Sequence, residues 1–141
     1  MKKLLLLVLL ALLAVVAGCD RDKYAAHRAE RGKPKVAVGD NTLTIRRAPY
    51  PNINVLPDGR MKVDDIEIPL GEPQRETLRN TFVQLQILRQ NTLSDPHTDR
   101  SERSVPITLP AHMQPFPADL STQIPEFKDY SEALPNLRAE P

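Results

Sequence analysis

A hydrophobic run near the start of the chain separates a removable leader from the part that folds. Leu4 to Ala17 is a run of 14 apolar residues, preceded by Lys2 and Lys3 and ended by small residues. A membrane-spanning helix needs roughly 20 apolar residues, so this run is short for a stable span. A positive start, a short apolar core and a small-residue end are typical of a secretory signal. We therefore expect residues 1–18 to be removed as a signal peptide.

The end of this run carries a resemblance to a known class. Val16-Ala17-Gly18-Cys19 resembles the lipobox of bacterial lipoproteins, whose cysteine is acylated and becomes the new N-terminus. The resemblance implies that Cys19 carries palmitate or a similar acyl chain and anchors the protein at the periplasmic side of a bacterial membrane. Asp20 resembles the sorting signal that keeps some Gram-negative lipoproteins in the inner membrane. The alternative is an ordinary signal peptide followed by a chance cysteine.

Composition narrows the classes of protein that remain. Cys19 is the only cysteine, so no intramolecular disulfide can form, and lipidation explains an odd cysteine in an exported chain. The 19 basic and 18 acidic residues nearly balance and leave no basic footprint for nucleic acid. Fourteen prolines and the absence of tryptophan favour a small core with long flanks.

The segment after the cysteine, residues 19–35, is expected to be an anchor and polar tether. Asp20 and Asp22 precede Tyr24, and arginines followed by Gly32 close the segment, a charge order that suits a short helix. Its basic excess would favour an anionic bilayer surface, while a solvated spacer is the alternative.

Residues 36–92 are predicted to form a small α+β module. Short apolar alternations separated by turn residues predict an antiparallel meander, with Asp58-Gly59 and Asp64-Asp65 as turns. The strands are expected at residues 36–38, 43–46, 53–56, 61–63 and 66–68.

One amphipathic helix is expected to cover this sheet. Gly71 to Gln74 resembles a capping box that starts it, and an apolar stripe faces the core. The stripe comprises Leu78, Phe82, Leu85 and Leu88. Val83 and Ile87 lie on nearly the opposite side, where a helix with a single apolar face is polar, so we expect a partner to pack there.

A second resemblance covers residues 53–92. The order of strand, Asp-Gly turn, strand, turn, strand and helix is similar to a segment of uncharacterised Gram-negative envelope proteins. Here it is carried by Asp58-Gly59, Met61, Val63, Ile66, Ile68, Leu70, Pro73, Gln74, Arg75 and Leu78. The chain departs from that pattern at Asp64-Asp65, where a glycine is expected in the turn. The resemblance implies no activity, and therefore no catalytic residue.

Residues 93–141 are expected to be a flexible linker and an extended proline-rich tail. The segment from Val105 holds seven of the 14 prolines, and its apolar residues are scattered. Phe127, Tyr130 and Leu134 are spaced as on one side of a short helix, so we expect this edge to dock weakly on Val83 and Ile87 or to remain free for a partner.

The histidines, acidic residues and glycines do not form a recognisable metal-binding, catalytic or phosphate-binding motif. His27, His97 and His112 lie in different segments, and Asp95 to Asp99 around His97 is better explained as a linker than as a metal site. Asp64, Asp65 and Glu67 show no acid–base pairing, and the glycines are too dispersed for a phosphate loop. We expect no catalytic residue, metal or cofactor.

Two function classes remain. The first, which we favour, is a lipid-anchored envelope lipoprotein that acts as a non-catalytic binding or scaffold module and has a protein partner in the envelope. The second is an enzyme or enzyme accessory of the cell envelope whose site is assembled from residues without a motif.

Overall fold

The computed structural model describes Met1 and residues 21–141. The predicted signal peptide, the lipidation residue Cys19 and the sorting residue Asp20 therefore lie outside the described residues. The chain divides into two compact units, Met1–Gly32 and Lys33–Pro141.

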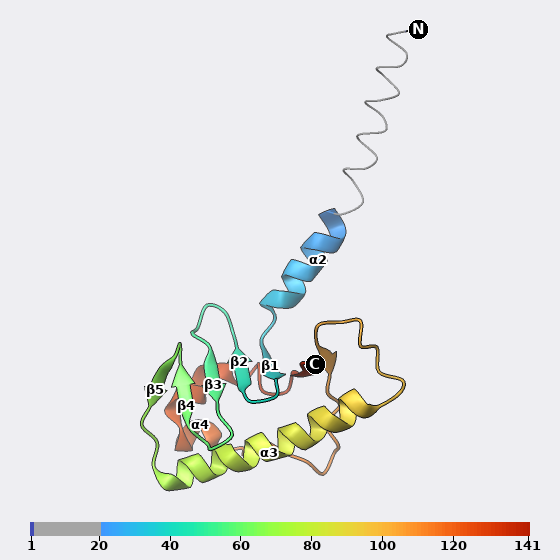
Figure 1. Ribbon diagram of the computed structural model, residues 1–141. Coiled ribbons are helices and arrows are strands. Elements are labelled where there is room, and N and C mark those ends of the chain that lie inside the picture. Colours follow the sequence, from blue (N-terminus) through green and yellow to red (C-terminus); the bar gives the residue numbers. More distant parts are fainter. Residues whose placement is uncertain (2–20) are drawn as a thin grey trace. The chain divides into compact units, whose positions relative to one another are not determined.

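The second unit is built on a seven-stranded sheet (Figure 1). The strands run in the order β5-β4-β3-β2-β1-β7-β6, and every neighbouring pair is antiparallel except β1 and β7, which are parallel. Their bounds are β1 Lys35–Val38, β2 Leu43–Arg46, β3 Ile53–Val55, β4 Met61–Val63, β5 Ile66–Ile68, β6 Val105–Pro106 and β7 Leu137–Ala139. The predicted α+β class is confirmed, and the sheet is larger than the small meander we expected.

Strand register aligns the apolar residues in two rows on one face of the sheet. Side chains alternate between the faces of a strand, so in-register pairing gathers every second residue on one side. One row joins Leu137, Val36, Ile45, Ile53, Val63 and Ile66, and the other joins Val105, Ala139, Val38, Leu43, Val55, Met61 and Ile68. Most of these side chains are buried, and they form the sheet side of the hydrophobic core.

The turn between β4 and β5 has a backbone conformation that restricts its sequence. Asp64 and Asp65, between β4 and β5, have φ of 45° and 68°, which matches the requirement of a tight hairpin turn for positive φ at both central residues. The Asp64 carboxylate accepts a hydrogen bond from the Asn52 N–H at 3.0 Å. The predicted turn is therefore present without a glycine, because aspartate tolerates the left-handed region better than most residues.

The long helix α3 (Glu72–Ser94) covers the apolar face of the sheet. At its start, the Gln74 side chain accepts a hydrogen bond from the Gly71 N–H at 2.8 Å, as expected from the predicted cap. All four residues of the predicted stripe are buried, together with Thr81 and Arg89. In Figure 1 the helix runs across the width of the sheet, from β5 past β1.

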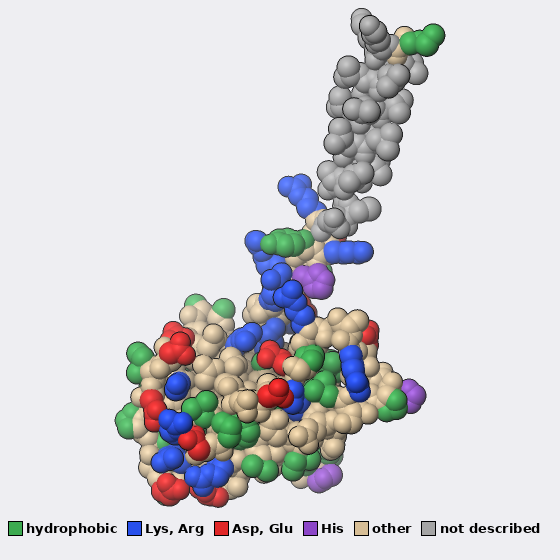
Figure 2. All heavy atoms as spheres, viewed as in Figure 1, with side chains coloured by type: hydrophobic (Ala, Val, Ile, Leu, Met, Phe, Trp, Pro, Cys, Tyr) green, Lys and Arg blue, Asp and Glu red, His purple; other side chains and the backbone are tan. Residues whose placement is uncertain are grey.

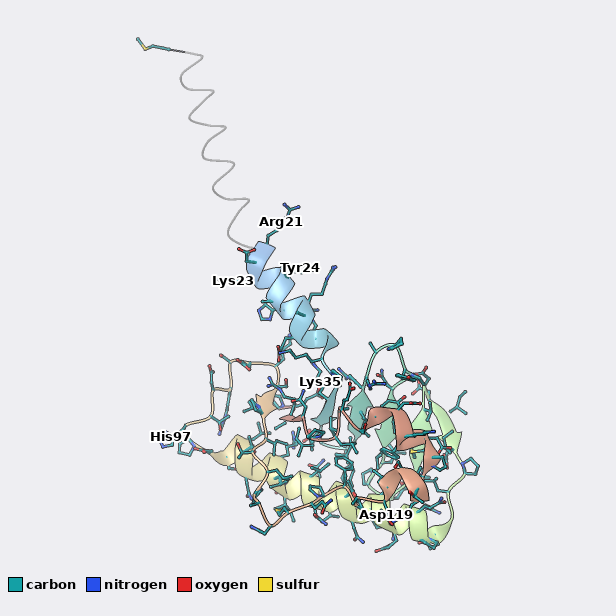
Figure 3. The ribbon with its side chains drawn as sticks, turned by 180° about the vertical axis from the view of Figure 1, so that it is seen from behind. Arg21, Lys23, Tyr24, Lys35, His97 and Asp119 are labelled. Atoms are coloured by element: carbon teal, nitrogen blue, oxygen red, sulfur yellow. The ribbon has the colours of Figure 1, made fainter. Side chains whose placement is uncertain are left out.

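The C-terminal segment is part of the same fold, so the prediction that residues 93–141 are a flexible linker and extended tail is wrong. After β6 come α4 (Leu120–Gln123) and the 3-10 helix η1 (Pro125–Tyr130), which lie behind the strands in Figure 1 and in front of them in Figure 3. β7 then pairs with β1 and β6 within the sheet. The buried apolar residues of this segment are Val105, Ile107, Phe116, Leu120, Ile124, Phe127, Tyr130, Ala133, Leu137 and Ala139.

The apolar density of this segment taken alone does not predict that it folds, because its apolar residues pack on surfaces that the rest of the unit provides. The segment is too sparse to form a core alone, but β1 offers an open edge and α3 and the sheet offer an apolar surface. The predicted module boundary at residue 92 is corrected accordingly, since the compact unit extends from Lys33 to Pro141.

The first unit contains α2 (Arg21–Gly32). The short helix predicted in the tether is therefore present, and none of its side chains is buried.

Candidate functional site

The exposed side of α3 is the best candidate for a binding surface in the folded unit. Val83 and Ile87 lie one turn apart and are 52% and 51% exposed, although both are large aliphatic residues. Their neighbours Phe82 and Leu88 point into the core, so the helix has apolar residues on both sides. The prediction that the pair lies outside the core is confirmed.

From this pair to the end of α3 the exposed side chains are uncharged, whereas the charged Arg79 lies one turn before Val83. The exposed positions of α3 from its middle to its end follow a spacing of three and four residues along one side. We call this set the neutral strip, and it comprises Asn80, Val83, Ile87, Gln90, Asn91 and Ser94. Exposed helix surfaces usually carry charged side chains, whereas the centres of protein–protein interfaces are depleted of them.

Charged side chains gather instead in the first two turns of α3. Arg79 pairs with Glu72 at 3.6 Å and also contacts Glu76, and Arg75 lies 3.9 Å from Glu72. Figure 2 shows charged side chains over the beginning of α3 and hydrophobic side chains at the surface farther along it. The helix surface therefore has a charged end and a neutral, partly apolar end.

The other three residues predicted to bind a partner are in the core. Phe127 is 1% exposed and Tyr130 3%, and both pack in the same cluster as the sheet residues, while Leu134 is partly buried against it. The predicted docking of this edge on Val83 and Ile87 is wrong, because the edge packs in the core while Val83 and Ile87 remain exposed. Phe127, Tyr130 and Leu134 are thus structural residues.

A polar cluster surrounds Tyr130 at the loop between β2 and β3. The Tyr130 hydroxyl donates to the Pro51 carbonyl oxygen, and its ring lies 6.0 Å from the ring of Tyr50. The Arg47 guanidinium stacks 4.9 Å from the Tyr50 centroid and its Nε lies 3.3 Å from a Glu132 carboxylate oxygen. No local sequence pattern marks this cluster, because contacts such as that of Arg47 with Glu132 join residues 85 positions apart in the sequence.

The polar groups of this cluster have a structural role. Burial raises the pKa of the Tyr130 phenol, and the charges of Asp64 and Asp129 act in the same direction. A raised phenol pKa keeps the proton on the oxygen at neutral pH, so the hydroxyl remains the donor to Pro51 and offers no general base. The cluster fastens the C-terminal segment to the β2–β3 loop.

A second set of polar contacts fastens α3 to the residues that follow the parallel strands β1 and β7. Arg89 donates from Nε to the carbonyl oxygen of Glu140 at 2.7 Å, and its Nη2 lies 2.7 Å from an Asp40 carboxylate oxygen. Gln86 donates to the carbonyl oxygen of Gly39. This explains why a charged residue stands among the buried positions of α3, since buried charges require partners.

The histidines do not converge on a metal site. Among the described residues, no group of three or more His, Cys, Asp or Glu side chains is arranged to hold a metal ion. The Asp95 carboxylate accepts a hydrogen bond from the His97 N–H at 2.8 Å and so closes a turn after α3, where Figure 3 labels His97.

In the described part of the chain, no helix is both long and apolar enough to cross a membrane.

Comparisons with known proteins found no similar protein: no family model, no curated protein and no solved structure matches this chain.

Proposed function

We propose that this chain is a lipid-anchored envelope lipoprotein that acts as a non-catalytic binding module at the periplasmic face of a bacterial membrane. The observation that carries the proposal is the lipobox-like Val16-Ala17-Gly18-Cys19. It stands directly before α2, a helix without a buried side chain, and before one compact unit. The proposed membrane anchor, a helix with no buried side chain and a folded unit follow one another in that order.

The neutral strip on α3 is the surface that we propose for a protein partner. Val83 and Ile87 would form its apolar centre, and the amide and hydroxyl side chains around them would form a polar rim. Such a composition allows a partner to dock without burying an unpaired charge, which would oppose binding. The strip belongs to a rigid, well-packed helix, so little conformational entropy would be lost at this side of the complex.

The proposal also includes retention in the inner membrane through Asp20. This assignment rests on the resemblance of the residue after the cysteine to a sorting signal. Membrane fractionation of the native protein checks it, and recovery in the outer membrane fraction would contradict it.

The function is tested by comparing the parent with Cys19→Ser in a Gram-negative cell. The parent is expected to enter the detergent-rich phase on phase separation, and the serine variant to remain in the aqueous phase. A photoreactive amino acid at position 87 should capture an envelope protein from the parent. The same group at position 97, outside the neutral strip, serves as the control and should not capture it.

Equal detergent partition of parent and variant would disprove the anchor. Equal crosslinking from positions 87 and 97 would disprove the binding surface while leaving the anchor in place.

A further inference from the structure

One side of α2 carries a stripe of arginine and tyrosine. Arg21, Tyr24, Arg28 and Arg31 follow a spacing of three, four and three residues within this helix. At 100° per residue these four side chains lie within an arc of about 80°. We call this set the arginine stripe.

The acidic residues of α2 lie on its other side. Asp22 and Glu30 both project about 140° from the centre of the arginine stripe. Positive charge is therefore concentrated along one side of the helix, although the helix as a whole contains both signs. Figure 2 shows Lys and Arg side chains around α2, and Figure 3 labels Arg21, Lys23 and Tyr24 on it.

Contacts within α2 support the arrangement of the stripe. The Arg28 guanidinium carbon lies 5.5 Å from the centroid of the Tyr24 ring, and Arg31 Nε donates to the His27 carbonyl oxygen at 3.4 Å. Tyr24 is nevertheless 60% exposed, and none of the helix is buried. The stripe therefore presents an aromatic ring and guanidinium groups side by side at the surface.

We propose that α2 lies along an anionic phospholipid surface with the arginine stripe facing the lipid, an inference that rests on the proposed anchor at Cys19. Guanidinium groups bind phosphate through paired hydrogen bonds, and tyrosine favours the level of the headgroups. A lipid on Cys19 would hold the first turn of α2 at that surface. The positive charge of the arginine stripe and its position next to the proposed lipid anchor thus both favour an anionic phospholipid surface as the binding partner of α2.

The attraction expected between the arginine stripe and an anionic membrane is large enough to assist the lipid anchor but not to replace it. Each basic residue near an anionic surface raises the membrane partition coefficient by about fivefold. A residue on the far side of the helix contributes less, because the helix is about 10 Å wide and the Debye length at physiological salt is about 8 Å. A solvated spacer would show no such difference between sides.

Tryptophan fluorescence tests which side of α2 meets the lipid, since the chain has no tryptophan of its own. The probe protein is the chain from residue 19 with Cys19→Ser, which keeps residues 21–141. Tyr24→Trp places the reporter in the arginine stripe, and Ala26→Trp places it about 160° around the helix. With vesicles of phosphatidylcholine and phosphatidylglycerol, emission should move to shorter wavelength for Tyr24→Trp and stay unchanged for Ala26→Trp.

A matched pair of charge variants tests the same arrangement by binding. Arg28→Gln and Lys23→Gln each remove one positive charge from α2, and glutamine is a good helix former. Arg28→Gln should weaken binding to anionic vesicles about fivefold, and Lys23→Gln by less than about twofold. Vesicles of phosphatidylcholine alone should bind neither the two variants nor the unlipidated probe protein from which they are made.

Equal losses for the two charge variants, or equal spectral shifts for the two tryptophans, would overturn the proposed orientation. Absence of binding to anionic vesicles would overturn the lipid partner and leave an acidic protein surface as the other occupant. These measurements use an unlipidated protein, so they stand whether or not Cys19 is acylated, whereas detergent partition of the parent tests the anchor alone.

Discussion

Gly59 shows how one residue connects the meander to α3. Its φ is +80°, and a Cβ atom at this position would lie 2.1 Å from the Arg75 carbonyl oxygen. Glycine is thus required twice, once by the left-handed backbone and once by the approach of the turn to the helix. The sequence predicted the turn, but it held no sign of the contact with Arg75, because that contact depends on how α3 packs.

Gly59→Ala is therefore expected to be among the most damaging small substitutions. Left-handed backbone strain and overpacking against the Arg75 carbonyl together should lower the free energy of unfolding by about 2–4 kcal/mol. Gly32→Ala is the control, since a Cβ there meets nothing within 4 Å. Urea unfolding monitored by circular dichroism measures both, and a Gly59→Ala variant as stable as Gly32→Ala would contradict the close approach.

At the scale of elements, periodicity located strands β1 to β5 and α3 but not the two C-terminal strands, β6 and β7. β1 to β5 and α3 each carry a local apolar pattern that predicts them. β6 and β7 are two and three residues long and pair with partners distant in the sequence, so no local pattern marks them. Phe127 and Tyr130 were recognised as an apolar edge, but their destination depends on a surface that exists only after the sheet has formed.

The neutral strip gives a prediction at the same scale. Val83→Asp with Ile87→Asp should leave the free energy of unfolding within about 1 kcal/mol of the parent, because surface substitutions each change it by about 0.5 kcal/mol or less. The same double variant should abolish crosslinking of the envelope partner from a photoreactive group at position 90. Leu85→Asp, two positions from both Val83 and Ile87 but in the core, should unfold the protein. Unfolding of the double variant would mean that the pair belongs to the core.

At the scale of the whole molecule, residues 33–94 and 105–141 should behave as two complementary parts of one cooperative unit. The exposed loop at residues 95–104 joins them, and three kinds of contact hold them together besides that covalent link. These are the pairing of β7 with β1, the shared hydrophobic core, and polar contacts such as Gln74 Nε2 donating to the Gln123 carbonyl oxygen at 2.6 Å.

Cutting the loop should therefore leave the fold assembled. A specific protease site inserted after Ser101 lies at an exposed position, where insertions are tolerated. After cleavage the two fragments should co-elute on size exclusion and separate in urea, since each fully buried apolar side chain of the C-terminal part contributes about 1.5–3 kcal/mol. Phe127→Ala should weaken that association, because the ring is buried in the shared core. If the fragments separate under native conditions, the result would instead support the original prediction of an independent module at residues 36–92 and a free tail.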